Sequence, residues 1–141
     1  MIQTIAVGTD GSETAGAAVD AAVEIAERFG AKVVLLSAFE NGESAYPVEG
    51  ATLELQWAKN PASLVREILQ RTEDEVRRRG LECATLVDEG HPGDVIVRLA
   101  AECNADMLVV GNKGMQRRVL GSVPNTVAHK APCSVYVVKT T

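Results

Sequence analysis

The chain has 141 residues, of which 46% are hydrophobic and 23% are charged, and its formal net charge at pH 7 is −5. Because the chain is acidic and holds no block of like charges, we expect neither a nucleic acid nor an anionic membrane surface as its partner. No apolar run approaches the roughly 18 residues of a membrane-spanning helix, and the first residues lack a signal-peptide pattern, so we expect a cytoplasmic protein. The three cysteines are odd in number and widely spaced, which favours reduced thiols over disulfides or a metal site.

Short apolar runs alternate with helical patterns along the chain. The runs predict strands at residues 4–8, 32–36, 81–86, 106–110 and 134–138. Apolar residues at helical spacing predict helices over residues 15–29, 64–76, 92–104 and 124–131. Gly30 and Gly80 follow the first two helices, at the position where glycine commonly ends a helix. This strict alternation predicts one α/β domain over residues 1–141, with a doubly wound parallel sheet.

Two segments depart from the simple alternation. The run at 81–86 is mixed in character, so we expect its strand to lie near an edge of the sheet. Residues 40–59, which include Tyr46 and Trp57, form a long connection of the kind that serves either as a lid over a ligand or as irregular packing. Both interpretations of this connection stay open at the level of the sequence.

Two of the predicted strands end in a glycine that is followed by a polar turn. Gly8, Thr9 and Asp10 end the first strand, and a glycine-rich segment from Gly111 to Ser122 follows the fourth. Ligands of open α/β sheets bind beyond the carboxyl ends of the strands, where the strand order reverses, so both turns would border one crevice if their strands are neighbours. Glycines let a backbone approach a ligand or adopt positive φ, and the N-terminus of a following helix favours phosphate. The pattern predicts a site for a nucleotide.

Several polar side chains in these turns could either contact a nucleotide or serve the fold alone. Asp10 could accept hydrogen bonds from ribose hydroxyls, hold a Mg²⁺ ion that bridges phosphates, or cap the first helix. Ser122 could cap the fourth helix or donate to a terminal phosphate. Lys113, Arg117 and Arg118 add positive charge to the segment, although solvated surface charge is the usual state of such residues.

Motifs spread over the whole chain resemble those of the universal stress protein family. They are Val7-Gly8-Thr9-Asp10-Gly11-Ser12, Gly111-x2-Gly114 followed by Gly121-Ser122-Val123-Pro124, and the closing Ala131-Pro132-Cys133-Ser134-Val135. The resemblance implies a five-stranded parallel sheet in the order 3-2-1-4-5 with helices on both faces. In the ATP-binding branch of the family, it implies a site shared between the ends of the first and fourth strands.

The resemblance also implies roles for individual residues. Gly8 and Asp10, with Thr9 between them, would lie near the ribose and phosphates, and the backbone of Ala38 would meet the adenine. The other residues of the expected site are Val110, Gly111, Asn112, Lys113 and Gly114 along the ribose and phosphate path, and Gly121, Ser122, Val123 and Pro124 around the outer phosphates.

One departure from the family pattern bears on the ligand. The family's ATP-binding signature is Gly-x2-Gly-x9-Gly-Ser/Thr, whereas only the six residues from Met115 to Leu120 separate Gly114 from Gly121 in this chain. Three fewer residues shorten the reach of the segment by up to about 10 Å. The flanking glycines and the Gly121-Ser122-Val123-Pro124 exit are nevertheless retained, so we expect ATP, with or without Mg²⁺, as the ligand. We keep two alternatives: cyclic AMP, whose single phosphate suits a shorter segment, and a dimeric interaction protein without a ligand.

We expect a regulatory or stress-response binding protein with at most slow ATP hydrolysis. An efficient phosphoryl-transfer catalyst needs a positioned base and a dedicated metal site, and Asp10 is the one obvious carboxylate in the predicted site. Members of the resembling family commonly form homodimers through the last strand. Residues Val135 to Val138 form an apolar run that would lie at a sheet edge, where such a strand invites pairing, so we expect a two-fold symmetric homodimer here.

Overall fold

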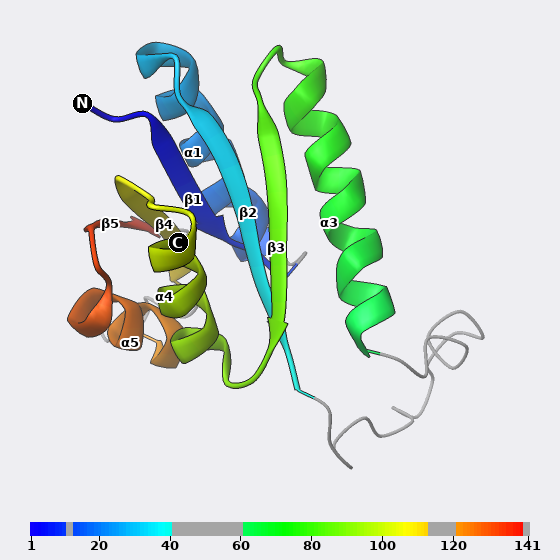
Figure 1. The fold of residues 1–141 in the computed structure, drawn as a ribbon, viewed down its shortest axis with the longest axis vertical. Helices are drawn as coiled ribbons and strands as arrows, with labels where there is room; N and C mark the ends of the chain where they lie inside the picture. Colours follow the sequence, from blue (N-terminus) through cyan, green and yellow to red (C-terminus); the bar gives the residue numbers. More distant parts are fainter. Residues whose placement is uncertain (11–12, 41–60, 113–120, 140–141) are drawn as a thin grey trace.

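The computed structural model describes residues 1–10, 13–40, 61–112 and 121–139, and strands alternate with helices throughout these ranges (Figure 1). The elements are β1 (Thr4–Gly8), α1 (Glu13–Phe29), β2 (Lys32–Phe39), α3 (Pro61–Arg78), β3 (Cys83–Glu89), α4 (Pro92–Glu102), β4 (Met107–Asn112), α5 (Ser122–Lys130) and β5 (Ser134–Lys139). Each predicted strand and helix is confirmed. The long connection that includes Tyr46 and Trp57 lies outside the described residues.

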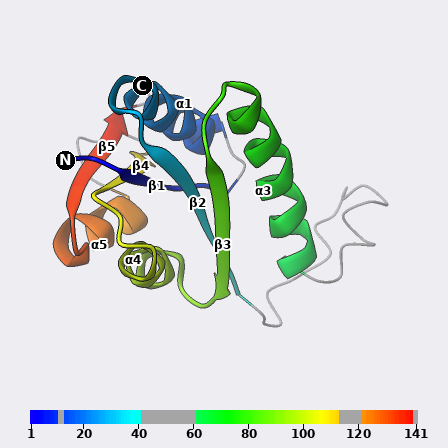
Figure 2. The same ribbon diagram turned by 45° about the horizontal axis from the view of Figure 1, so that its top comes forward.

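The strands form one parallel sheet in the order β3-β2-β1-β4-β5, as the family resemblance implied. Helices α1 and α3 cover one face of the sheet, and α4 and α5 cover the other, which Figure 2 shows from a second side. The strand order reverses between β1 and β4, which are direct neighbours. The mixed run after Leu81 becomes the edge strand β3, as expected.

Side chains of the central strands point alternately into two apolar cores. Ile5 and Val7 of β1 pack under α1, whereas Ala6 between them packs under α4, and all three are fully buried. Because both faces of the sheet are covered, nearly every position of such a strand must be apolar. This requirement explains why these strands read as continuous apolar runs in the sequence.

Three strands continue two or three residues beyond their predicted carboxyl ends. β2 runs on to Phe39, β3 to Glu89 and β4 to Asn112, and the parallel register pairs Ala38 with Asp88. The ladder of backbone hydrogen bonds therefore continues where the apolar pattern has already stopped. These extensions carry polar residues to the carboxyl ends of the strands, where the candidate site lies.

Turns with positive φ end the first two helices. Gly30 has φ 66° and Gly80 has φ 82°, which confirms both as helix-ending glycines. Phe29 was expected on the buried stripe of the first helix, but the structure leaves it 58% exposed. It is the last residue of α1.

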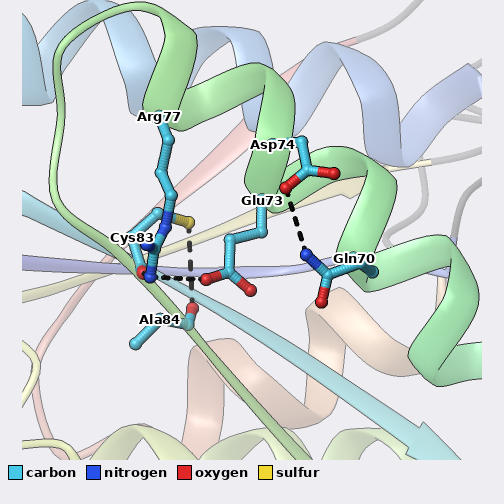
Figure 3. Close-up of polar contacts among 6 residues, drawn as sticks. All are labelled: Gln70, Glu73, Asp74, Arg77, Cys83 and Ala84. Atoms are coloured by element: carbon cyan, nitrogen blue, oxygen red, sulfur yellow. Dashed lines mark hydrogen bonds and ion pairs between the residues drawn. The ribbon is translucent and has the colours of Figure 1, made fainter.

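An arginine of helix α3 forms a hydrogen bond with the start of β3. The guanidinium of Arg77 donates a hydrogen bond to the carbonyl oxygen of Cys83 at 2.8 Å and pairs with Glu73 at 2.7 Å (Figure 3). Gln70 and Asp74 form a further link along the same helix. The Cys83 thiol is buried beside these groups, and its burial, with a smaller effect of the Glu73 charge, raises its pKa to about 11. All three cysteines are free, as their spacing indicated.

Strand β5 lies at the edge of the sheet, where it pairs with β4 alone. Its Tyr136 side chain is 43% exposed. The pairing of two copies through this strand stays a prediction. Over the part of the chain that the structure describes, no helix is both long enough and apolar enough to cross a membrane.

The Asp106 carboxylate ties the start of β1 to the start of β4. Its Oδ2 atom accepts hydrogen bonds from the backbone N–H groups of Gln3 and Thr4, each at 2.9 Å. These two bonds lower the pKa of Asp106 below its ordinary value of 3.8, and the bond from Gln3 has the larger effect. A carboxyl whose pKa is lowered by folding stabilises the fold above its ordinary pKa, and this stabilisation is lost as the pH falls through the lowered value.

We expect the Asp106→Asn variant to be less stable than the wild type at pH 7, because an amide oxygen accepts the two hydrogen bonds more weakly than a carboxylate does. The difference in unfolding midpoint should be constant above about pH 5 and should shrink as the pH falls below 3.8, the ordinary pKa of the group. Thermal unfolding of both proteins between pH 7 and pH 2 measures this difference. Curves that stay parallel down to pH 2 would show that the charge of Asp106 does not contribute.

Candidate functional site

A cleft of about 300 Å³ opens at the carboxyl ends of β1 and β4, where the strand order reverses. The connections that leave these two strands go to opposite faces of the sheet, so the turns separate and leave a crevice between them. The described residues that line the cleft are Gly8, Thr9, Asp10, Thr14, Ala15, Ser37, Ala38, Pro92, Ile96, Val110, Gly111, Gly121, Ser122, Val123 and Pro124.

Most of the residues that the sequence assigned to a site are brought together here. Those that line the cleft are Gly8, Thr9, Asp10, Ala38, Val110, Gly111, Gly121, Ser122, Val123 and Pro124. Asn112 is an exception: its side chain is fully buried next to the cleft and contacts the protein itself. Lys113, Gly114, Arg117 and Arg118 lie outside the described residues.

Sequence reasoning missed five lining residues. Thr14 and Ala15 come from the first turn of α1, Ser37 from the end of β2, and Pro92 and Ile96 from the first turns of α4. A helix that follows a strand in a parallel sheet begins at the carboxyl edge, so its first turn borders any crevice at that edge. The four-residue spacing of Pro92 and Ile96 at the start of a predicted helix was the available signal.

One wall of the cleft is apolar. Ile96 and Val110 are 6% and 2% exposed, and both belong to the core under α4. Ala38 and Val123 pack against the same core and add apolar surface to the wall. A Cβ atom at Gly8 would stand 3.0 Å from Ile96 Cδ1 and 3.4 Å from Val110 Cγ1, so the glycine keeps this wall open. A wall of this kind suits a flat aromatic ring, which gains from the burial of its apolar faces.

The N-terminus of α5 forms another part of the cleft lining. Gly121 is the N-cap residue, with φ −61° and ψ 170°, and as a glycine it has no side chain of its own to cap the helix. The first N–H groups of a helix have no partner within the helix, and they carry the positive end of its dipole. Since Pro124 has no N–H group, the backbone donors of the first turn are those of Ser122 and Val123. These two donors suit an anionic group.

Two other backbone donors of the cleft serve the fold. The N–H group of Thr9 donates to the carbonyl oxygen of Leu36 at 2.9 Å. The N–H group of Gly121 donates to Oδ1 of Asn112, also at 2.9 Å. These two N–H groups are therefore engaged within the protein, whereas the first turn of α5 carries the N–H groups of Ser122 and Val123 at the cleft.

Gly111 is required by packing within the protein. A Cβ atom at this position would stand 2.6 Å from the carbonyl oxygen of Thr14 and 2.7 Å from its Cγ2 atom. None of Gly8, Gly111 and Gly121 has positive φ, so positive φ, one of the two roles that the sequence analysis considered for these glycines, does not apply to them. The glycine at 111 lets the start of α1 lie directly against the end of β4.

Asp10 supplies an exposed carboxylate at the mouth of the cleft. Among the described residues, no three His, Cys, Asp or Glu side chains gather in a way that could hold a metal ion. A Mg²⁺ ion keeps several water ligands and commonly binds through one carboxylate together with substrate phosphates. These residues therefore fit a Mg²⁺ ion only as the companion of a phosphate ligand.

The universal stress protein family model matches residues 1–139. The chain belongs to this family. A curated relative, Universal stress protein Rv1636 of Mycobacterium tuberculosis, is 35% identical over 146 aligned residues, which cover 99% of this chain and 97% of the relative. The similarity therefore extends over the candidate cleft and the rest of the fold.

Two solved structures of the family are similar along their whole length. A universal stress protein in complex with cAMP has a TM-score of 0.72 and 33% identity, and the match covers 99% of this chain and 98% of that protein. The universal stress protein of Archaeoglobus fulgidus in complex with dAMP has a TM-score of 0.70 and 26% identity, with 99% and 100% coverage. Both relatives bind an adenine nucleotide that carries one phosphate.

Proposed function

We propose that residues 1–141 form one nucleotide-binding domain of regulatory function, which binds an adenine nucleotide in the cleft between β1 and β4. The observation that carries this proposal is that an apolar wall and the N-terminus of α5 line one cleft. The base would lie against Ile96 and Val110, near Ala38. The phosphate would accept hydrogen bonds from the first turn of α5.

We favour cyclic AMP over ATP as the ligand. The part of the cleft that the described residues form has a volume of about 300 Å³, which lies at the lower end of the range for small-molecule sites. The segment between Gly114 and Gly121 is three residues shorter than in the ATP-binding signature. The relatives solved with cAMP and dAMP also hold a single phosphate. ATP, with Mg²⁺ held by its phosphates and Asp10, is the second candidate.

Binding titrations with the purified chain test this proposal. Cyclic AMP, AMP, ATP with and without Mg²⁺, and adenosine are each titrated by calorimetry, with cyclic GMP as the control for the base. We expect cyclic AMP to bind at least tenfold more tightly than adenosine, a difference of about 1.4 kcal/mol. Tighter binding of Mg-ATP than of cyclic AMP would reverse our order of ligands.

Two further outcomes would contradict the proposal itself. Equal affinity for adenosine and for every nucleotide would remove the role of the α5 N-terminus. Absence of binding to all adenine compounds would favour the alternative of an interaction protein without a ligand.

A further inference from the structure

Asn112 makes a buried polar link at the end of β4. Its side chain is 0% exposed, and its Oδ1 atom accepts a hydrogen bond at 2.9 Å from the backbone N–H group of Gly121, nine positions later in the chain. A buried amide side chain is retained in a core only where hydrogen bonds offset its loss of water. The link joins the last residue of one strand to the N-cap residue of the next helix.

This link fixes the start of α5 relative to the sheet. Helix α5 packs mainly on α4, where a Cβ atom at Gly93 would stand 2.9 Å from the Thr126 side chain. That contact lies one turn or more beyond the N-terminus of α5. The bond from Gly121 to Asn112 therefore supplies a direct tie between the N-terminus itself and the strand that borders the cleft.

The bond also sets which N–H groups of the helix can serve a ligand. It engages the N–H group of Gly121 and so orients the peptide that leads into α5. The next two donors, those of Ser122 and Val123, are then the first that an anion in the cleft meets. A shift of about 1 Å in such donors is enough to weaken hydrogen bonds that depend on a narrow range of distance.

We infer that Asn112 is a positioning residue for the phosphate subsite, which holds the first turn of α5 against the cleft without touching the ligand. This inference rests on the proposed function. It adds that the contribution of the phosphate to the binding affinity can be separated from the contribution of the base. It assigns Asn112 a different role from the direct place on the phosphate path that the family resemblance implied. The neutral amide suits this role, because a carboxylate at the same position would place a negative charge beside the anion.

The test compares Asn112→Ala with Asn112→Asp and with Asn125→Ala, which makes the same truncation at an exposed position of α5 outside the cleft. Affinities for cyclic AMP and for adenosine are measured by calorimetry for each protein. We expect Asn112→Ala to bind cyclic AMP at least tenfold more weakly and adenosine within twofold of the wild type. Asn125→Ala should match the wild type for both ligands.

The aspartate variant provides the second readout and covers failure of the alanine variant to fold. Asn112→Asp retains an acceptor for the Gly121 N–H group, so hydrogen exchange of that amide should stay slow, whereas in Asn112→Ala it should become at least tenfold faster. The charge added in Asn112→Asp should still weaken the binding of cyclic AMP and leave the binding of adenosine unchanged. The inference would be overturned if either Asn112 variant kept the wild-type ratio of its affinities for cyclic AMP and adenosine, whether both affinities are unchanged or both fall by the same factor.

The wild type reports on the proposed function separately. If the unmodified protein binds no adenine nucleotide, the proposed function fails, whatever the variants do. Unchanged exchange of the Gly121 amide in Asn112→Ala would then overturn the positioning role by itself, without any ligand.

Discussion

Replacement of Ala38 by phenylalanine should abolish adenine-nucleotide binding and leave the fold intact. Ala38 lies near the carboxyl end of β2, and its small side chain packs beside the apolar wall of the cleft. A phenyl ring at this position would take the space that we assign to the adenine. We expect the affinity for cyclic AMP to fall more than about 100-fold, which corresponds to about 2.7 kcal/mol. Calorimetric titration measures this loss.

The stability of the Ala38→Phe variant is the internal control. Ala38 is only partly buried, so the free energy of unfolding should change by less than about 1 kcal/mol. Ala84→Phe makes the same change at an exposed position of β3 that does not line the cleft, and it should bind cyclic AMP like the wild type. Retained binding in Ala38→Phe would place the ligand outside this cleft, whereas loss of binding in both variants would point to a general effect of the added ring.

The fold was predictable because burial on both faces leaves a strong pattern in the sequence. Strands such as β1 must be apolar at nearly every position, and the helices that cover them carry apolar stripes that end at Gly30 and Gly80. The carboxyl ends of β2 and β4 were predicted too short, because the apolar runs stop before Ser37 in β2 and before Gly111 and Asn112 in β4. Ser37 and Asn112 are buried in the structure, since parallel pairing continues through them.

The candidate site was predictable in part. The ends of β1 and β4 were recognisable from their glycines, and the family resemblance supplied the strand order that makes them neighbours. Contributions from the first turns of α1 and α4 depend on how each helix docks on the sheet. Local spacing places Pro92 and Ile96 on one face of a helix, but it does not encode how that helix docks, so lining residues such as Thr14 and Ile96 were missed.

Glycine has more than one physical role at such a site, and a sequence does not say which applies. The pattern suggested that Gly111 lets the backbone approach a ligand or adopt positive φ. Its φ is in the ordinary range, and the space beside it is filled by the backbone of Thr14. Gly111 therefore lines the cleft, as its place in the predicted segment suggested, but the glycine is needed there for packing within the protein.

This packing leads to the second large effect that we expect, in the variant Gly111→Ala. The added Cβ atom would stand 2.6 Å from the carbonyl oxygen of Thr14, and a backbone atom cannot move aside as a flexible side chain can. The end of β4 and the start of α1 must then separate. We expect the free energy of unfolding to fall by about 1–3 kcal/mol, the usual range for an overpacked core. Equilibrium unfolding in urea measures this change.

A glycine of α1, the helix against which Gly111 packs, provides the matched control. Gly16 lies exposed in α1, and a Cβ atom there would meet nothing within 4 Å, so Gly16→Ala should stabilise the protein by about 0.5–1 kcal/mol through helix propensity. The same chemical change should thus affect the stability with opposite signs at positions 16 and 111.

Adding Thr14→Ser to Gly111→Ala removes the Cγ2 contact at 2.7 Å but not the contact with the carbonyl oxygen, so it should recover only part of the lost stability. Full recovery would mean that the Thr14 side chain alone limits the approach, and a Gly111→Ala variant as stable as the wild type would show that α1 does not press against β4 at this point.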